Sequence, residues 1–152
     1  MSNDGRPPQA PEADAPDGAY HLQEQIGFVL RKAHQRHVSI FAAQIADLTP
    51  PQFAALARLH EDGATSQNQL GQMVAMDAAT IKGVIDRLKA RGLVTLTRHE
   101  ADKRRLLVAL TAEGRETVER LVPLARRATQ ETLAPLSPKE IAQLMRLLAR
   151  IA

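Results

Sequence analysis

Basic side chains are concentrated between residues 77 and 105 of this 152-residue chain. That window holds eight Lys and Arg against four Asp and Glu, a net charge of +4, whereas the whole chain carries +3. Ammonium and guanidinium groups pair with phosphate, so such a cluster is typical of proteins that bind nucleic acid. A helix that is merely solvated by its charges has the same composition. The elements that hold these residues must therefore decide between the two interpretations.

The composition excludes several other kinds of chemistry. The chain has no cysteine, which excludes disulfides, thiolate zinc sites, iron–sulfur clusters and thiol redox sensing. It contains no glycine-rich phosphate loop, no HExxH, no G-x-S-x-G and no pair of carboxylates on one apolar face. We therefore expect no enzyme activity and no cofactor. Apolar residues make up 44%, enough for a core, but aromatics make up only 3%, which argues against base-stacking platforms.

The segment before the basic window predicts three helices. Apolar residues recur at steps of three and four from 20 to 47, which predicts one long helix. The next helix is capped by Thr49, has prolines in its first turn and ends at Gly63. A short third helix follows, capped by Thr65 or Ser66.

The basic window itself predicts a helix followed by a hairpin. Asp77 is a good N-cap and Gly92 a good C-terminal stop for the helix. Two β-rich runs, 93–97 and 106–111, then flank a charged loop. The short third helix and the helix after Asp77, joined by a tight turn, form a helix-turn-helix pattern. A hairpin directly after such a pattern is called a wing. Residues 112–152 predict a long helix and a shorter one after Ser137. The fold class is therefore mainly α with a small β-hairpin: a winged helix-turn-helix (49–111) flanked by long N- and C-terminal helices (20–47 and 112–152).

The helix after Asp77 divides into two faces. Plotted at 100° per residue, one arc holds the apolar side chains Ile81, Val84, Ile85 and Leu88. The opposite face holds small residues and is edged by cations, so it can enter a major groove without steric obstruction. Thr80 and Lys82 are expected at base edges or phosphates, and Arg87 at a phosphate. Asp86 either pairs with Lys82 or accepts from a cytosine amino group, and the sequence leaves both open.

The loop between the two β-rich runs carries the arginines of the wing. Arg104 and Arg105 could reach the adjacent minor groove, where narrow A·T tracts attract Arg. Asp102 either orients Arg104 through a charge-assisted hydrogen bond or helps to form the turn. The predicted DNA-binding set is Thr80, Lys82, Gly83, Asp86, Arg87, Arg98, Lys103, Arg104 and Arg105.

The N-terminal segment has a different character. Residues 1–19 carry four acids and one base and are rich in proline, which predicts a disordered acidic leader rather than a signal peptide. No apolar run is long enough to span a membrane. We expect a cytoplasmic protein with no membrane partner.

The chain resembles the MarR family of bacterial transcriptional regulators from about Leu22 to its C-terminus. Three stretches carry the resemblance: LTPPQFAALARL, QLGQMVAMDAATIKGVIDRLKARGLV and DKRRLLVALTAEG. The last is the most specific, through Asp102, Arg104, Leu110, Thr111 and Gly114. The family often has Arg soon after the GLV turn, where this chain has Thr95 and Leu96, so Arg98 is expected to substitute.

The resemblance implies a homodimer, built from the first and last helices, on a pseudo-palindromic double-stranded operator. It also implies repression that a small ligand relieves. The residues agree on one point, because the flanking helices carry more apolar surface than one protomer can bury.

The first long helix offers a candidate ligand site. His37 and Phe41 project from its apolar face, Arg31 and His34 lie near the edge, and Phe53 arrives from the second helix. A cation or imidazole beside aromatic rings suits a flat organic anion, so we expect an aromatic or pyridine carboxylate effector. The stretch EQIGFVLRKAHQRH resembles the branch of the family that regulates nicotinate catabolism, which implies an effector such as 6-hydroxynicotinate and a role in aromatic acid catabolism.

Two alternatives compete with this reading. His34 and His37 have the i, i+3 spacing of two metal ligands, which would fit a metal-responsive regulator, but no carboxylate accompanies them. The prediction is therefore no metal site. The other alternative is a winged helix used only for protein–protein contacts, which salt dependence of binding to duplex DNA would distinguish.

Overall fold

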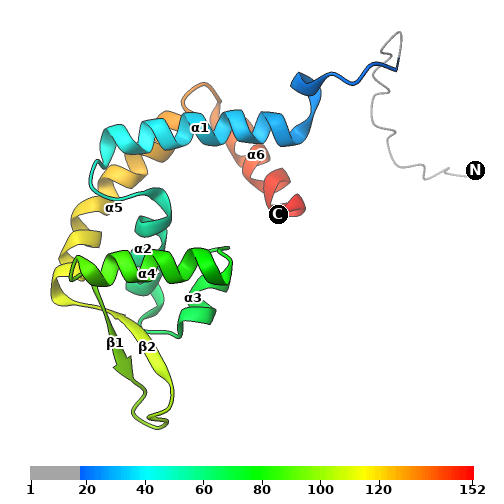
Figure 1. Ribbon diagram of the computed structural model, residues 1–152. Helices are drawn as coiled ribbons and strands as arrows, with labels where there is room; N and C mark the ends of the chain where they lie inside the picture. Colours follow the sequence, from blue (N-terminus) through cyan, green and yellow to red (C-terminus); the bar gives the residue numbers. More distant parts are fainter. Residues whose placement is uncertain (1–17) are drawn as a thin grey trace, which may run out of the picture. The chain divides into compact units, whose positions relative to one another are not determined.

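The structure is a computed structural model that describes residues 18–152, and it divides the chain into two compact units. The boundary lies between Ala33 and His34, inside the first long helix. Figure 1 labels most of the elements, which are a short 3₁₀ helix, six α-helices and two strands in the described residues: η1 (Leu22–Glu24), α1 (Ile26–Gln44), α2 (Pro50–Asp62), α3 (Gln67–Met73), α4 (Ala78–Ala90), β1 (Val94–Arg98), β2 (Leu106–Leu110), α5 (Ala112–Leu133) and α6 (Pro138–Ile151).

The first unit holds η1 and the first turns of α1. Its apolar side chains Leu22, Ile26, Val29 and Leu30 are exposed. The ammonium of Lys32 lies 5.8 Å from the centre of the Phe28 ring. Residues 1–17 of the predicted acidic leader lie outside the described residues.

The first helix is shorter than predicted. The sequence indicates helix from 20 to 47, whereas η1 and α1 are separated by Gln25, which is extended. The α-helix ends at Gln44, and residues 45–48 connect it to Thr49, which is extended before Pro50 and caps α2.

The other helices begin at the residues that the sequence indicates. Thr49 and Ser137 each form a reciprocal capping box with the residue three positions later. Ser66, rather than Thr65, accepts from the backbone N–H of Gln69 and caps α3. Asp77 caps α4, with Oδ1 accepting from Thr80 N at 2.7 Å.

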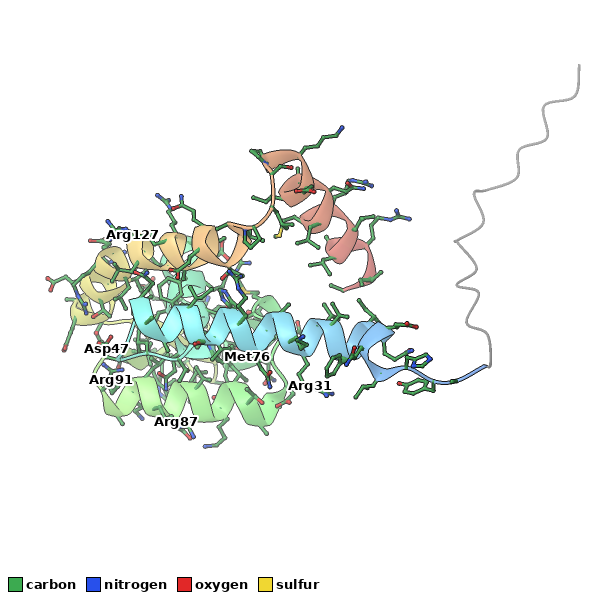
Figure 2. All side chains as sticks on the ribbon, turned by 90° about the horizontal axis from the view of Figure 1, so that it is seen from above. Arg31, Asp47, Met76, Arg87, Arg91 and Arg127 are labelled. Atoms are coloured by element: carbon green, nitrogen blue, oxygen red, sulfur yellow. The ribbon has the colours of Figure 1, made fainter. Side chains whose placement is uncertain are left out.

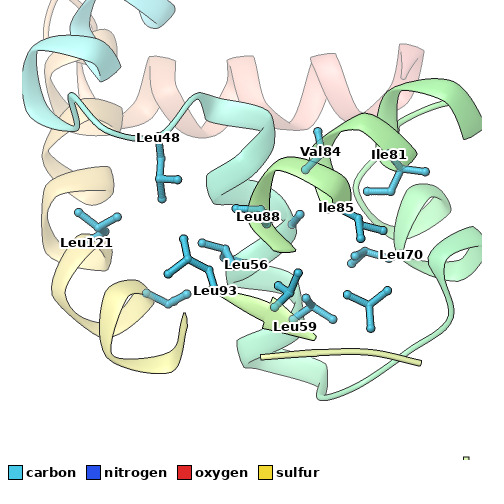
Figure 3. Close-up of a cluster of buried hydrophobic side chains, with 14 of the residues drawn as sticks. Leu48, Leu56, Leu59, Leu70, Ile81, Val84, Ile85, Leu88, Leu93 and Leu121 are labelled. Carbon is cyan, nitrogen blue, oxygen red and sulfur yellow. The ribbon is translucent and has the colours of Figure 1, made fainter. Parts of the chain in front are cut away.

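A single apolar core joins α2, α3, α4, α5 and the hairpin in the second unit (Figure 3). All four residues predicted on the inner face of α4 are at most 4% exposed: Ile81, Val84, Ile85 and Leu88. Leu56 from α2 and Leu70 from α3 are fully buried against them. The inner face of α4 is therefore fixed by packing, which leaves the opposite face to solvent.

The hairpin pairs Val94 with Leu110 and Arg98 with Leu106 in an antiparallel register. Thr65, in the α2–α3 connection, exchanges two backbone hydrogen bonds with Val108 of β2. The wing is therefore joined to the helix-turn-helix by backbone pairing as well as by the buried side chains of its base.

The start of α5 is packed tightly against the end of the α4–β1 turn. The Thr111 hydroxyl donates to the Gly92 carbonyl at 2.6 Å and accepts from Gly114 N at 3.0 Å. A Cβ at Gly114 would lie 2.0 Å from the carbonyl oxygen of Leu93. Only glycine fits there, which explains the Leu-Thr-x-x-Gly pattern of the sequence.

The last helix, α6, has no buried residue among its fourteen. Its large apolar side chains include Met145, Leu147 and Ile151, all exposed in the single chain. Within residues 18–152, the helices are all too short or too polar to cross a membrane.

Candidate nucleic-acid interface and ligand cavity

The outer face of α4 is the first candidate site. Thr80, Lys82, Asp86 and Arg87 are exposed, and Gly83 is half-buried between them. The helix begins at Asp77, whose carboxylate accepts from the backbone N–H of Thr80, and this hydrogen bond holds the pKa of the Asp77 carboxyl below its ordinary value. The ionised carboxylate lies at the positive end of the helix dipole, and it fixes the N-terminal turn from which Thr80 projects.

Lys82 and Asp86 form an ion pair on this face. Nζ lies 2.7 Å from Oδ2, and the two side chains remain 65% and 59% exposed. Of the two roles that the sequence leaves open for Asp86, the free protein adopts the pairing with Lys82. The pair reduces the charge that Lys82 presents and restrains its flexible side chain.

Arg87 lies on the outer surface of α4 (Figure 2). A Cβ at Gly83 would meet only the Arg87 guanidinium, at 3.8 Å. The absence of a side chain at Gly83 therefore leaves a shallow surface between Thr80 and Arg87. Such a surface allows close approach of another molecule to the helix backbone.

The wing presents its basic residues at the tip of the hairpin. Lys103, Arg104 and Arg105 are exposed. Asp102 Oδ1 accepts from the backbone N–H of Arg104 at 3.1 Å, so Asp102 forms the turn in the way the sequence predicts as one of two options. Arg98 Nη1 donates to the Lys103 carbonyl at 2.7 Å, which ties β1 to the tip, and the side chain remains exposed.

The residues predicted to bind a ligand are brought together only in part. The ring centres of His37 and Phe41 are 6.2 Å apart, and those of Phe41 and Phe53 are 5.9 Å apart. Phe41 is 4% exposed and belongs to the core. His34 is exposed on α1, and Arg31 is exposed and belongs to the first unit.

The hydrogen bonds of His37 show which ring nitrogen carries a hydrogen. The Thr132 hydroxyl donates to the Ala128 carbonyl at 2.7 Å, so it has no hydrogen left for the imidazole. His37 Nδ1, 2.9 Å from Thr132 Oγ1, must therefore donate. In the neutral ring this leaves Nε2 as an acceptor. The imidazole is thus oriented by α5 and offers one acceptor to its surroundings.

Arg36 is a further residue of this region, and no pattern in the sequence distinguishes it. Its guanidinium donates to the carbonyl oxygens of Glu131 and Thr132, at the C-terminal end of α5. A cation at this end satisfies carbonyls that have no partner within the helix. Arg36 and His37 therefore hold α1 against the last turn of α5.

A cavity of about 460 Å³ lies between α2 and α5. Its lining is largely apolar, with polar side chains at the rim: Phe53, Ala57, Glu61, Val122, Ala125, Arg126, Thr129 and Gln130. Phe53 is the member of the predicted ligand set that lines it. The Arg126 guanidinium forms no ion pair within residues 18–152, whereas its rim neighbour Glu61 pairs with Arg58 at 3.2 Å.

The five α5 residues of this cavity are missing from the sequence prediction. A long helix exposes every third or fourth residue to a neighbour, but the sequence does not say which stripe of α5 faces α2. Within the described part of the chain, no three His, Asp or Glu side chains gather into a possible metal site.

Comparison with known proteins gives consistent results. The MarR family pattern matches residues 48–106. The HTH-type transcriptional repressor NicR of Pseudomonas putida is 38% identical over 153 residues, covering 99% of this chain and 95% of that protein.

Two solved structures illustrate the likeness. One describes how 6-hydroxynicotinic acid regulates DNA binding by BpsR of Bordetella bronchiseptica; it is 44% identical with a TM-score of 0.83, covering 88% of this chain and 97% of that one. A MarR variant of Escherichia coli in complex with operator DNA is 25% identical with a TM-score of 0.76, covering 82% and 91% of the two chains.

Proposed function

Because this chain belongs to the MarR family of transcriptional regulators, we propose that it is a homodimeric repressor that binds a pseudo-palindromic operator and is released by a small pyridine or aromatic carboxylate. The observation that carries the proposal is the solvent-facing surface of α4 beside the arginine-tipped wing, both within the second unit. For a DNA-binding regulator we expect a cytoplasmic location.

In this proposal, α4 enters the major groove. Thr80, Lys82 and Gly83 approach base edges, and Arg87 contacts a phosphate. Asp86 either holds Lys82 through their ion pair or releases it and accepts a hydrogen bond from a cytosine amino group. Lys103, Arg104 and Arg105 of the wing bind the neighbouring minor groove and backbone, while Arg98 supports the loop that carries them.

The dimer would cover apolar surface that is exposed in the single chain. The first unit exposes Ile26, Val29 and Leu30, and α6 separately exposes Met145, Leu147 and Ile151. Helices with such faces are stable when another surface buries them. A second copy of the chain supplies that surface and also places two copies of α4 on one duplex.

The effector site is proposed around the rings of His37, Phe41 and Phe53 and the cavity between α2 and α5. Phe53 packs on a flat ring, and Arg126 at the rim pairs with its carboxylate. His37 Nε2 accepts from a hydroxyl or ring N–H donor of the effector. The resemblance to NicR and to BpsR, whose DNA binding 6-hydroxynicotinic acid regulates, favours a hydroxylated pyridine carboxylate for this chain.

The DNA-binding part of the proposal is tested with the full chain and a fluorescent duplex from upstream of its own coding sequence. We expect specific binding that weakens steeply with salt, with a log–log slope of about −0.9 for each phosphate contacted. Sedimentation should show a dimer before DNA is added. A monomer, or binding equal to that of a shuffled duplex at low salt, would contradict the proposal.

The effector part is tested by titrating 6-hydroxynicotinate, nicotinate and benzoate into the protein–DNA complex. Arg126→Gln and His37→Ala should retain DNA affinity but require roughly tenfold or more effector for release, because each loses a charged or oriented polar contact. Arg127→Gln is the matched control, since Arg127 is exposed on the same helix and does not line the cavity. If effector releases the Arg126 and His37 variants from DNA as it releases the wild type, the effector binds elsewhere.

A further inference from the structure

The tip of the wing is organised around the side chain and backbone of His99. Its side chain is half-buried, although the residues around it in the loop, 100–105, are exposed. Imidazole Nδ1 accepts from two backbone donors, Ala101 N at 3.1 Å and Asp102 N at 3.2 Å. One side-chain atom thus satisfies two consecutive amides of a loop that has no regular structure.

The backbone of His99 completes the same arrangement. Its N–H donates to the Arg105 carbonyl at 3.0 Å, and Arg105 N donates to the Asp102 carbonyl at 3.0 Å. Both ends of the loop are therefore held by hydrogen bonds that involve His99 or the residue it restrains, Asp102. Asp102 in turn accepts from Arg104 N through its carboxylate.

Packing does little to fix this loop. The residues of the apolar core include Val94 and Val108 from the base of the hairpin but none from 99–105. In an exposed segment without apolar contacts, hydrogen bonds decide how many conformations the backbone samples. A ligand that needs one of these conformations binds less tightly when the others are populated.

We propose that His99 is a positioning residue of the wing: its neutral imidazole, by accepting from Ala101 N and Asp102 N, holds the loop in the conformation that presents Arg104 and Arg105 to DNA. This inference rests on the proposed role of the wing in DNA binding. It requires the tautomer in which Nε2 carries the hydrogen, because only an unprotonated Nδ1 can accept.

Protonation of His99 has two opposing effects in this arrangement. It places a hydrogen on Nδ1 facing two N–H groups, which opens the loop, and it adds a positive charge that favours phosphate. The charged residues nearest to His99 in the sequence are Arg98, Glu100, Asp102, Lys103, Arg104 and Arg105. The positioning role predicts that a neutral acceptor at this position is enough for DNA binding, whereas a purely electrostatic role predicts that only a cation is.

The test compares His99→Ala with His99→Asn in the full chain, using the duplex from upstream of its own coding sequence. Asn places Oδ1 at the same number of bonds from the backbone as imidazole Nδ1 and readily accepts from the residues that follow it. We expect His99→Ala to lose about tenfold in affinity, because two hydrogen bonds are missing. His99→Asn should bind within about threefold of the wild type, and both variants should melt as the wild type does.

The same variants separate positioning from charge. A positioning role predicts that His99→Asn keeps the affinity that His99→Ala loses, whereas a role through charge predicts the same loss in both variants, because neither replacement is cationic. The loss caused by Arg104→Ala should also be smaller in the His99→Ala background, because a disordered loop already presents Arg104 poorly.

Three results would overturn the inference: unchanged affinity of His99→Ala, equal loss in both variants, or full additivity with Arg104→Ala. If the wild type itself fails to recognise the duplex, the proposed function fails, and that outcome is distinct from any of these. If His99→Ala does not fold, His99→Asn still decides: binding within about threefold of the wild type supports the inference, and a larger loss overturns it.

Discussion

The guanidinium of Arg91 contacts Asp47 twice, once at the backbone and once at the side chain. Nη1 donates to the Asp47 carbonyl at 2.5 Å, and Nη2 lies 3.5 Å from Oδ2 (Figure 2). Arg91 is the C-cap of α4, and Asp47 lies in the connection between α1 and α2. The contact therefore ties the C-terminal end of the proposed recognition helix to the chain that leaves α1.

This relationship predicts unequal effects of removing its two partners. Arg91→Ala deletes both contacts, including the one to a backbone carbonyl, and should lower the free energy of unfolding by about 1 kcal/mol. Asp47→Ala keeps the carbonyl contact and loses only a half-exposed ion pair, worth about 0.5 kcal/mol or less. Urea denaturation measures both, with Glu61→Ala as a control for loss of another exposed pair. If Arg91→Ala and Asp47→Ala lower the free energy of unfolding equally, the hydrogen bond from Arg91 to the Asp47 carbonyl contributes nothing.

The wing arginine gives a prediction about salt. Arg104→Ala should weaken operator binding and reduce the magnitude of the log–log salt slope by about 1 for each protomer, because one phosphate or minor-groove contact is lost. Since the Arg104 side chain is exposed and its backbone makes the turn contact, the melting temperature should not change. Fluorescence anisotropy at several salt concentrations measures the slope. An unchanged slope would remove Arg104 from the interface.

The Lys82–Asp86 pair gives a prediction about specificity. Asp86→Asn releases Lys82 from a 2.7 Å ion pair and removes one negative charge from the face of α4. Binding to a shuffled duplex should therefore rise several-fold, while the preference for the operator falls, because affinity without sequence information comes from phosphate charge. Stability should change by about 0.5 kcal/mol or less. A preserved preference for the operator would show that Asp86 plays no part in discrimination.

The second unit could be predicted from the sequence where local chemistry decides. The caps Thr49, Asp77 and Ser137 act over three residues, and the inner face of α4 follows directly from its apolar period. The family branch was predicted from the residues too, in agreement with the similarity to NicR and BpsR. These features depend on short-range interactions that a sequence displays.

Contacts between distant elements could not be predicted in this way. Arg36 caps α5 some ninety residues along the chain, and Arg98 donates to the carbonyl of Lys103 across the wing loop. The cavity rim at Arg126 depends on which stripe of α5 faces α2. Such contacts are set by tertiary packing, which leaves no periodic trace around the residues involved.

The cap of α4 makes the stability of the fold depend on pH. The hydrogen bond from Thr80 N lowers the pKa of Asp77 below its ordinary value of 3.8, so the folded state favours the carboxylate. The stabilisation is complete above the unfolded pKa and is lost as the pH falls through the folded one. Compared with Asp77→Asn, the wild type should therefore lose more stability on acidification below about pH 4. Chemical denaturation at several pH values measures the difference, and parallel curves would contradict it.

Two glycines of the second unit should respond to alanine in opposite directions. At Gly114 the new Cβ would lie 2.0 Å from the Leu93 carbonyl oxygen, so the α5 start must shift away from the α4–β1 turn, at a cost of about 2 kcal/mol. At Gly83, in the middle of α4, the nearest atom is the flexible Arg87 guanidinium at 3.8 Å, and alanine should stabilise the helix by about 1 kcal/mol.

The same two glycine variants distinguish an effect on folding from an effect on DNA recognition. Gly83→Ala should weaken operator binding in spite of its higher melting temperature, because the methyl group occupies the surface that is proposed to approach the base edges. Gly114→Ala should weaken binding only as far as it unfolds the protein, and so should recover affinity on cooling. Thermal melting and anisotropy on both variants measure this. A Gly83→Ala protein that is more stable and binds the operator as the wild type does would show that α4 does not approach DNA through this face.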